Sequence, residues 1–218
     1  MLTKLVFCFS LLIFICRPSY AALKDKKMIT VAINQFKNEL DPVKAYNFNQ
    51  FILIQCVMDT MLHLDEAGNI SSEVIKKWEV SNDRKTYTFE IDSKFKFHNN
   101  EPITSKDVAL SLSRHLWENS GSIVKQYLDQ IEGYSQLKEG QLPKGIKIIS
   151  DYKVSITLKK PSPSFLYVLT MPSFSIISSS EMKKGNLVGS GRMTLAPNKE
   201  NGYTLTAWKK YIGKRPQL

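Results

Sequence analysis

Three pairs of β-type segments, each joined by a short polar turn, most constrain what this chain can fold into. In the central pair, residues 86–91 (TYTFEI) alternate between polar and apolar side chains, and residues 81–85 form the turn. This alternation has the period of a half-buried strand. The pairs are 79–80 with 86–91, 146–149 with 153–158, and 192–196 with 203–208. Strands joined by such short connections pair antiparallel, which excludes a purely parallel sheet.

Helical segments are interleaved with these hairpins. The clearest helix start lies at residues 102–107, where Thr104 and Asp107 fit a capping box, and apolar residues then continue to about Trp117. Further helices are predicted from Asn49 through the apolar run 51–62 and over residues 72–78 (a single turn), 122–137 and 165–169, and a strand is predicted over residues 28–34. The fold class is therefore mixed α/β, with α+β elements and β-hairpins.

The N-terminus has the pattern of a secretory signal peptide. Lys4 precedes an apolar run of residues 5–15, and the small residues Ser19 and Ala21 favour cleavage after Ala21. The run is shorter than the ~20 residues that a membrane-spanning helix needs, although an uncleaved N-terminal anchor is the alternative. We expect a signal peptide over residues 1–21, a folded domain over residues 22–218, and a location in the periplasm.

The net charge of +10 falls to +8 once residues 1–21, with Lys4 and Arg17, are removed. The basic residues occur as scattered pairs between apolar segments, which is typical of a solvated surface. An exported protein rarely meets nucleic acid, so no nucleic-acid partner is predicted. Cys56 is the one cysteine beyond residue 21, and its apolar neighbours indicate a small buried hydrophobe.

The sequence offers no catalytic constellation. Its histidines, His63, His98 and His115, are far apart in the chain, and the HExxH, CxxC and GxSxG patterns are absent. The glycine-rich segment 185–191 lacks the GK[ST] of a phosphate loop, and a turn or hinge is the preferred interpretation. We therefore predict no enzyme, no cofactor and no metal site.

One stretch carries a distinctive motif. Residues 78–81 (WEVS), 87–91 (YTFEI), 96–108 (KFHNNEPITSKDV) and 111–114 (SLSR) follow one another. This order resembles the "W-x-x-S … Y-T-F-x-L … K-F-H-D-G-x-P-x-T-A-x-D-V-x-x-S-x-x-R" signature of the family 5 extracellular solute-binding proteins. These proteins are receptors of bacterial ABC importers. Matches to the family also include Leu40-Asp41-Pro42 and residues 64–70, 151–154, 158–166, 188–191 and 211–216.

The chain departs from the family pattern in three places. Asn99 and Asn100 replace the Asp-Gly of the turn, while Arg192 and Met193 stand where the family has proline and an aromatic residue. Members also continue into a second lobe, whereas this sequence ends at Leu218. The resemblance thus implies the first lobe of a periplasmic-binding-protein type II-like fold with the second lobe missing. A truncated or split gene, a degraded paralogue and a single lobe with a reduced role remain open.

The resemblance implies a periplasmic substrate-binding component of an ABC transporter. Such a protein captures a peptide or related small solute and delivers it to the permease subunits in the inner membrane. The alternative is an exported single-lobe interaction or scaffold protein without solute transport. By the same resemblance, the expected ligand-binding residues are Tyr46, Asn47, Phe48, Gly189, Ser190 and Gly191. For both groups, packing within the fold is the competing interpretation.

Overall fold

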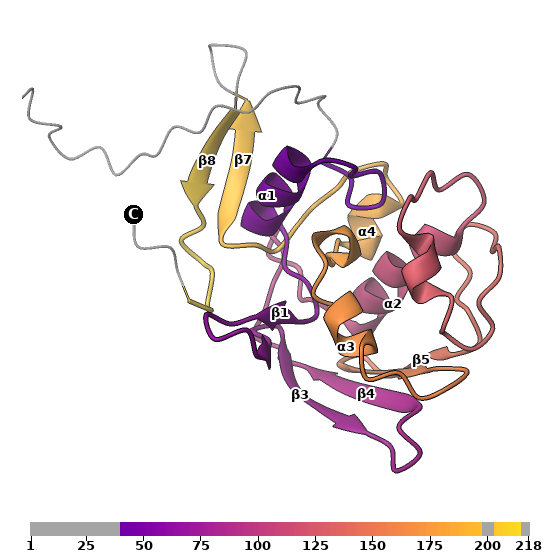
Figure 1. Cartoon of the computed structure of the whole chain (residues 1–218). Coiled ribbons are helices and arrows are strands. Elements are labelled where there is room, and N and C mark those ends of the chain that lie inside the picture. The colour runs from indigo at the N-terminus through magenta and orange to yellow at the C-terminus, as the bar shows by residue number, and fades with distance from the viewer. Residues whose placement is uncertain (1–39, 198–202, 215–218) are drawn as a thin grey trace, which may run out of the picture. The chain divides into compact units, whose positions relative to one another are not determined.

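A computed structural model describes residues 40–197 and 203–214 (Figure 1). Its α-helices are α1 (Phe48–Val57), α2 (Ser105–Ser113), α3 (Phe165–Val168) and α4 (Ser179–Met182). Its strands are β1 (His63–Leu64), β2 (Ile70–Ser71), β3 (Ile75–Val80), β4 (Thr86–Ile91), β5 (Ile146–Ser150), β6 (Lys153–Thr157), β7 (Met193–Pro197) and β8 (Tyr203–Ala207). Short 3-10 turns span Arg114–Leu116, Lys125–Leu128 and Pro172–Phe174. The predicted signal peptide and the predicted strand over residues 28–34 lie outside the described residues.

The central sheet is antiparallel and has the strand order β3-β4-β6-β5. Phe89 of β4 lies opposite Trp78 of β3 and Val154 of β6, so these side chains share one face. That face forms one side of the main core, and α2 and α3 lie over it (Figure 1). Thr88 occupies the other face, opposite Glu79. The alternation in residues 86–91 therefore separates core from solvent, as the sequence predicted.

All three predicted hairpins are confirmed. The β3–β4 and β5–β6 hairpins supply the central sheet, and β7 pairs with β8 in a separate two-stranded sheet. The small β1–β2 pair closes around a turn at residues 65–69, in which Asp65 Oδ1 accepts from the amides of Ala67 and Asn69 at 2.9 and 2.8 Å. Within the described residues, no helix has the length and apolar content needed to span a bilayer.

Two predicted helices are wrong. Residues 72–78 do not form a helical turn, because Ile75 pairs with Ile91 and begins β3. Sheet pairing and burial of Ile75 outweigh the weak local preference for a helix. Residues 122–137 contain only the 3-10 turn Lys125–Leu128. Their buried Leu128 and Ile131 instead fix an irregular loop to the main core.

The predicted bounds of two other helices also need correction. The helix expected from Asn49 to residue 62 begins one residue earlier, at Phe48, and ends at Val57, because Met58 has extended backbone (φ −137°, ψ 140°). The next residues then enter the main core through Met61 and Leu62. Likewise α2 ends at Ser113, and a 3-10 turn continues the segment to Leu116.

The capping box at the start of α2 is confirmed. Asp107 Oδ2 accepts from the amide of Thr104 at 2.8 Å and from its hydroxyl at 2.6 Å. The other carboxylate oxygen, Oδ1, accepts from the amide of Ser179 at 2.8 Å. Asp107 therefore satisfies donors at the start of α2 and at the start of α4, which are distant in sequence.

A buried ion pair connects α2 to the segment before α1. The guanidinium of Arg114 donates to Asp41 Oδ1 at 3.1 Å and Oδ2 at 2.8 Å, in the bidentate geometry that arginine favours. Side-chain exposure is only 14% for Arg114 and 7% for Asp41. Breaking such a pair on one side leaves an uncompensated buried charge.

We therefore expect Asp41→Asn to lower the free energy of unfolding by about 3 kcal/mol. Urea unfolding followed by circular dichroism measures this change. Glu132→Gln is the matched control, because it removes a carboxylate from an exposed pair with Lys144 and should change stability little. Equal, small effects of the two substitutions would contradict the structural role of the buried pair.

Candidate ligand-binding site

The first group of predicted ligand-binding residues lies at the start of α1. Asn47 is the N-cap of this helix, and its Oδ1 accepts from the amide of Gln50 at 3.0 Å. Gln50 Oε1 in turn accepts from the amide of Tyr46 at 3.0 Å. These contacts fix the backbone, while the side chains of Tyr46 and Phe48 remain 57% and 76% exposed. The two aromatic rings are therefore available for an apolar contact.

The second group, residues 189–191, is buried against the opposite end of α1. The amide of Gly191 donates to the carbonyl oxygen of Val57 at 3.0 Å. A Cβ on Gly189 would lie 2.2 Å from that same oxygen, and a Cβ on Gly191 would lie 2.5 Å from the amide nitrogen of Met58. Both glycines thus permit a close approach that any side chain would prevent.

The structure does not bring the two predicted groups together. They lie at opposite ends of α1, a ten-residue helix that is ~15 Å long at 1.5 Å per residue. Direct contact with a ligand remains a prediction for both. The geometry gives residues 189–191 a close-packing role, and it leaves Tyr46 and Phe48 as the exposed pair.

Gly189→Ala should therefore destabilise the fold by about 2 kcal/mol, since its Cβ would overlap the backbone carbonyl of Val57, which cannot move aside as the Met58 side chain can. The control is Gly185→Asn: Gly185 has φ +80°, nothing lies within 4 Å of the position that a Cβ would occupy there, and asparagine tolerates this backbone. Urea unfolding should show a change of less than ~0.5 kcal/mol for this control. Similar midpoints for the two variants would refute the close-packing role.

A cavity of about 670 Å³ lies where α1 ends. Its walls come from the last turns of α1 and the residues just after it, from β1, from the segments that precede β3 and β7, from the segment after α3, and from Tyr211 beyond β8. The lining residues are Ile52, Gln55, Cys56, Met58, Asp59, Thr60, His63, Leu64, Glu73, Val74, Thr170, Met171, Pro172, Arg192, Met193 and Tyr211. Its size is within the 300–1,000 Å³ range of small-molecule sites.

Charged side chains gather at one wall of this cavity. Arg192 donates to Glu73 Oε1 at 2.7 Å, and the other Glu73 oxygen accepts from the amide of Lys214 at 2.8 Å. The hydroxyl of Tyr211 donates to Asp59 Oδ1 at 3.0 Å. Asp59 Oδ2 is closed off from solvent and has no hydrogen-bond partner among the described residues. An unsatisfied buried acceptor of this kind costs roughly 1–3 kcal/mol.

The surroundings of Asp59 favour its protonated form. Burial raises the pKa of the Asp59 carboxyl to about 7, and the nearby negative charge of Glu73 adds to this effect. Hydrogen bonds from Ser190 and Tyr211 and the positive charge of Arg192 act in the opposite direction but do not cancel it. Burial and the negative charges of Asp59 and Glu73 also raise the pKa of the Tyr211 hydroxyl.

The sequence analysis did not select this cluster. One signal was present, because Asp59 is the single charged residue within the apolar run 51–62. A second was Arg192, which departs from the family pattern. The remaining members, Glu73 and Tyr211, are distant in sequence from both, so only the folded chain assembles the group.

The raised pKa of Asp59 predicts a pH-dependent stability. An acid whose pKa is higher in the folded state stabilises the fold at low pH, and this contribution is lost as pH rises from about 4 through 7. The unfolding free energy of the wild type should therefore fall by about 2 to 3 kcal/mol more than that of Asp59→Asn between pH 5 and pH 8.

Urea unfolding at both pH values measures this difference. Comparison with the variant is essential because burial lowers the pKa of His115 to about 4. That histidine makes stability rise with pH over an overlapping range, which opposes the effect of Asp59. Parallel pH profiles for the wild type and Asp59→Asn would overturn the assignment.

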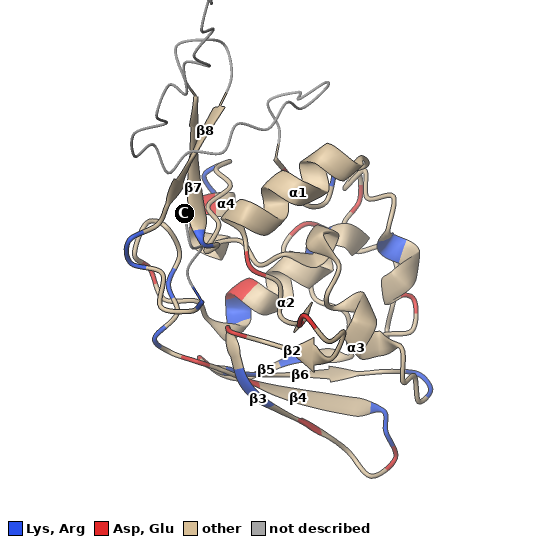
Figure 2. Ribbon diagram, turned by 60° about the vertical axis from the view of Figure 1, so that its left-hand side comes forward, with Lys and Arg blue, Asp and Glu red and all other residues tan. Residues whose placement is uncertain are grey.

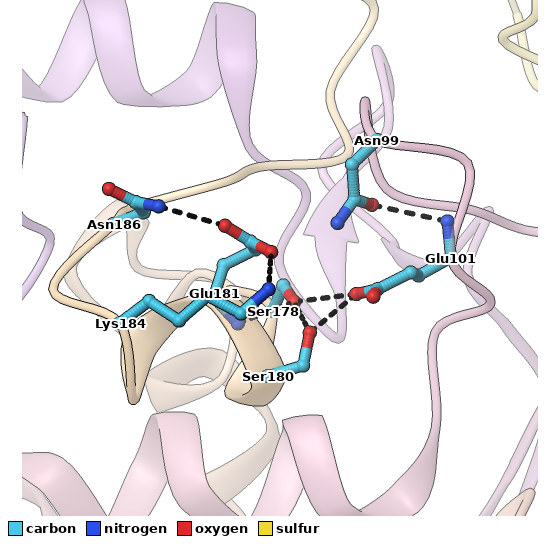
Figure 3. Close-up of polar contacts among 7 residues, drawn as sticks. All are labelled: Asn99, Glu101, Ser178, Ser180, Glu181, Lys184 and Asn186. Carbon is cyan, nitrogen blue, oxygen red and sulfur yellow. Dashed lines mark hydrogen bonds and ion pairs between the residues drawn. The ribbon is translucent and has the colours of Figure 1, made fainter.

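The segment that leads to residues 189–191 is held by a polar cluster around Glu101 (Figure 3). Glu101 Oε2 accepts from Ser178 at 3.1 Å and from Ser180 at 2.5 Å. Glu181 in α4 contacts Lys184 at 2.7 Å and Asn186 at 2.9 Å. These bonds hold the residues on both sides of the turn after α4. They therefore fix the position from which the chain continues to residues 189–191, which pack against α1.

Solved structures identify the class of fold. OppA of Listeria monocytogenes bound to peptide superposes with a TM-score of 0.72 at 20% identity, over 80% of this chain and 37% of that chain. The substrate-binding domain of an oligopeptide ABC transporter from Bacillus anthracis gives 0.72 at 20% identity, over 79% and 36%. The fold is therefore that of a solute-binding protein, and the predicted mixed α/β class with hairpins is confirmed.

The family follows from the sequence itself. The profile of the bacterial extracellular solute-binding proteins, family 5 Middle, matches residues 69–218. This chain belongs to that family, as its motifs indicated.

This chain covers a limited part of the length of its relatives. The periplasmic oligopeptide-binding protein OppA of Escherichia coli is 27% identical over 191 residues, which are 82% of this chain and 35% of OppA. A dipeptide-binding protein of Lactococcus lactis is 28% identical over 121 residues, 54% of this chain and 22% of that protein. The chain thus spans about a third or less of the length of these relatives.

Proposed function

We propose that this protein is a periplasmic substrate-binding component of an ABC transporter that captures peptides and delivers them to the permease in the inner membrane. Membership of family 5 carries the proposal, and the names of its relatives, an oligopeptide-binding and a dipeptide-binding protein, supply the ligand class. In this role the chain binds and releases its ligand and catalyses no reaction.

Features of the described residues support capture of a peptide. The cavity at the end of α1 has the volume of a small-molecule site, and it combines apolar walls with a few charged groups. At the other end of α1, Tyr46 and Phe48 expose aromatic rings. Exposed aromatic residues of this kind supply large contact areas in binding sites at a small cost in side-chain entropy.

Thermal unfolding of the purified chain with a mixture of di- to pentapeptides tests the proposal. A ligand at 100 times its dissociation constant stabilises the folded state by about 2.7 kcal/mol. We therefore expect the midpoint to rise by about 5 °C or more. Phe48→Ala should reduce this rise while leaving the midpoint of the free protein almost unchanged, because its side chain is 76% exposed.

Tyr167→Ala is the matched control, since Tyr167 is an exposed aromatic residue of α3 and lies outside both predicted groups. It should leave the peptide-induced rise intact. A cooperative transition that no peptide shifts would count against peptide capture and favour the interaction-protein alternative. Equal losses in the two variants would remove Phe48 from the proposed site while leaving peptide binding itself in place.

A further inference from the structure

Two carboxyl groups and the carbonyl end of a helix lie at the cavity beside α1. The carbonyl end of α1 carries the negative end of the helix dipole, and the helix has no basic residue in its last turn. Indeed α1 contains no charged residue, so its ribbon is tan throughout in Figure 2. The carboxylates of Asp59 and Glu73 lie close by and line the same cavity.

Arg192, the arginine that lines the cavity, does not balance the charges of both carboxylates. The guanidinium of Arg192 is engaged by Glu73 at 2.7 Å, while Asp59 Oδ1 accepts from the Tyr211 hydroxyl, a neutral donor. Asp59 Oδ2 is left without a partner among the residues that the structure describes. The cluster is therefore complete except for one donor, and a positively charged donor would also complement its field.

We propose that this cavity binds a positively charged nitrogen of the ligand, a primary ammonium or a guanidinium, with the Asp59 carboxylate as its acceptor. Because Oδ2 is closed off from solvent in the free protein, binding requires the Asp59 side chain to turn an oxygen toward the cavity that this residue lines. This inference rests on the proposed function, in which the ligand is a peptide. The nitrogen belongs either to the peptide's N-terminus or to a lysine or arginine side chain. Ile52, Met58 and Val74 line the cavity and provide apolar surface for the hydrocarbon part of the ligand.

Binding of a cation should be coupled to loss of a proton from Asp59. The groups that face Asp59 are Glu73, Arg192 and Tyr211, and His63 lines the same cavity. Since the pKa of Asp59 is raised to about 7, only the ionised fraction is ready for a cation, and this fraction rises about tenfold between pH 6 and pH 8. For a lysine or arginine side chain, which stays charged over this range, affinity should rise with pH in the same proportion. For a peptide N-terminus, whose own pKa is about 8, the rise should be only about fivefold.

Isothermal titration calorimetry with four peptides tests the inference and separates the two sources of charge. Trialanine against N-acetyl-trialanine examines the terminal ammonium, and N-acetyl-Ala-Lys-Ala against N-acetyl-Ala-Met-Ala examines the side chain. We expect the charged member of one pair to bind at least about tenfold more tightly. In Asp59→Asn this preference and the rise of affinity with pH should both disappear, while Asp129→Asn, which removes an exposed carboxylate away from the cavity, should retain them.

Proton release gives a measurement that needs no variant. Titrations of the wild type at pH 6 in buffers of different ionisation enthalpy should report nearly one proton released per charged peptide bound. An absence of charge preference in the wild type, or the same preference in Asp59→Asn, would overturn the inference.

A probe without peptide groups separates this inference from the proposed function. If none of the peptides binds, peptide capture fails, and cadaverine, a diamine, then tests the cavity alone. Cadaverine binding that Asp59→Asn abolishes would sustain the cation site. Absence of cadaverine binding, or binding that survives in the variant, would refute it.

Discussion

The buried carboxylate of Asp107 is the constraint on which the arrangement of the described elements depends. It accepts from Thr104 at the start of α2 and from Ser179 at the start of α4. Further along α2, the hydroxyl of Ser111 accepts from the amide of Ile177 at 3.0 Å. Because polar groups in a core must be satisfied, these bonds define how the segment before α4 lies along the helix.

The same helix controls the approach to α1. Arg114 follows α2 and pairs with Asp41. The residues that lead into α1 are therefore fixed by α2, which also binds the start of α4 through Asp107. At the far end of α1, the carbonyl oxygen of Asp59 accepts from the amide of Ile176 at 2.8 Å, and that of Val57 accepts from Gly191 at 3.0 Å. Both ends of α1 are thus fixed, and the cavity beside its last turn has a defined wall.

This wall contains a residue, Asp59, that lowers the stability of the fold. An aspartate with a solvent-inaccessible oxygen that has no partner in the described part of the chain and with a raised pKa weakens the fold at neutral pH, whereas an amide of the same shape would avoid the buried charge. Groups of this kind are common at functional sites, where binding compensates for the lost stability. Arg192 belongs to the same wall and stands where the family signature has proline.

The sequence by itself determined those features that depend on neighbouring residues. The alternation in residues 86–91 fixed a one-sided hairpin, Thr104 and Asp107 fixed the start of α2, and the ordered motifs from Trp78 to Arg114 fixed the family. In each case the deciding interactions lie within a few residues or within one hairpin, so spacing alone reveals them.

Only the tertiary structure decided the rest. Whether residues 72–78 form a helical turn or a strand depended on pairing with β4, and the pKa of Asp59 depends on burial by segments that are distant in sequence. The close packing of Gly189 against Val57 likewise arises between residues far apart in the chain. Desolvation, sheet pairing and close backbone contact all depend on neighbours that are distant in sequence. The local sequence therefore carries too little information to predict them.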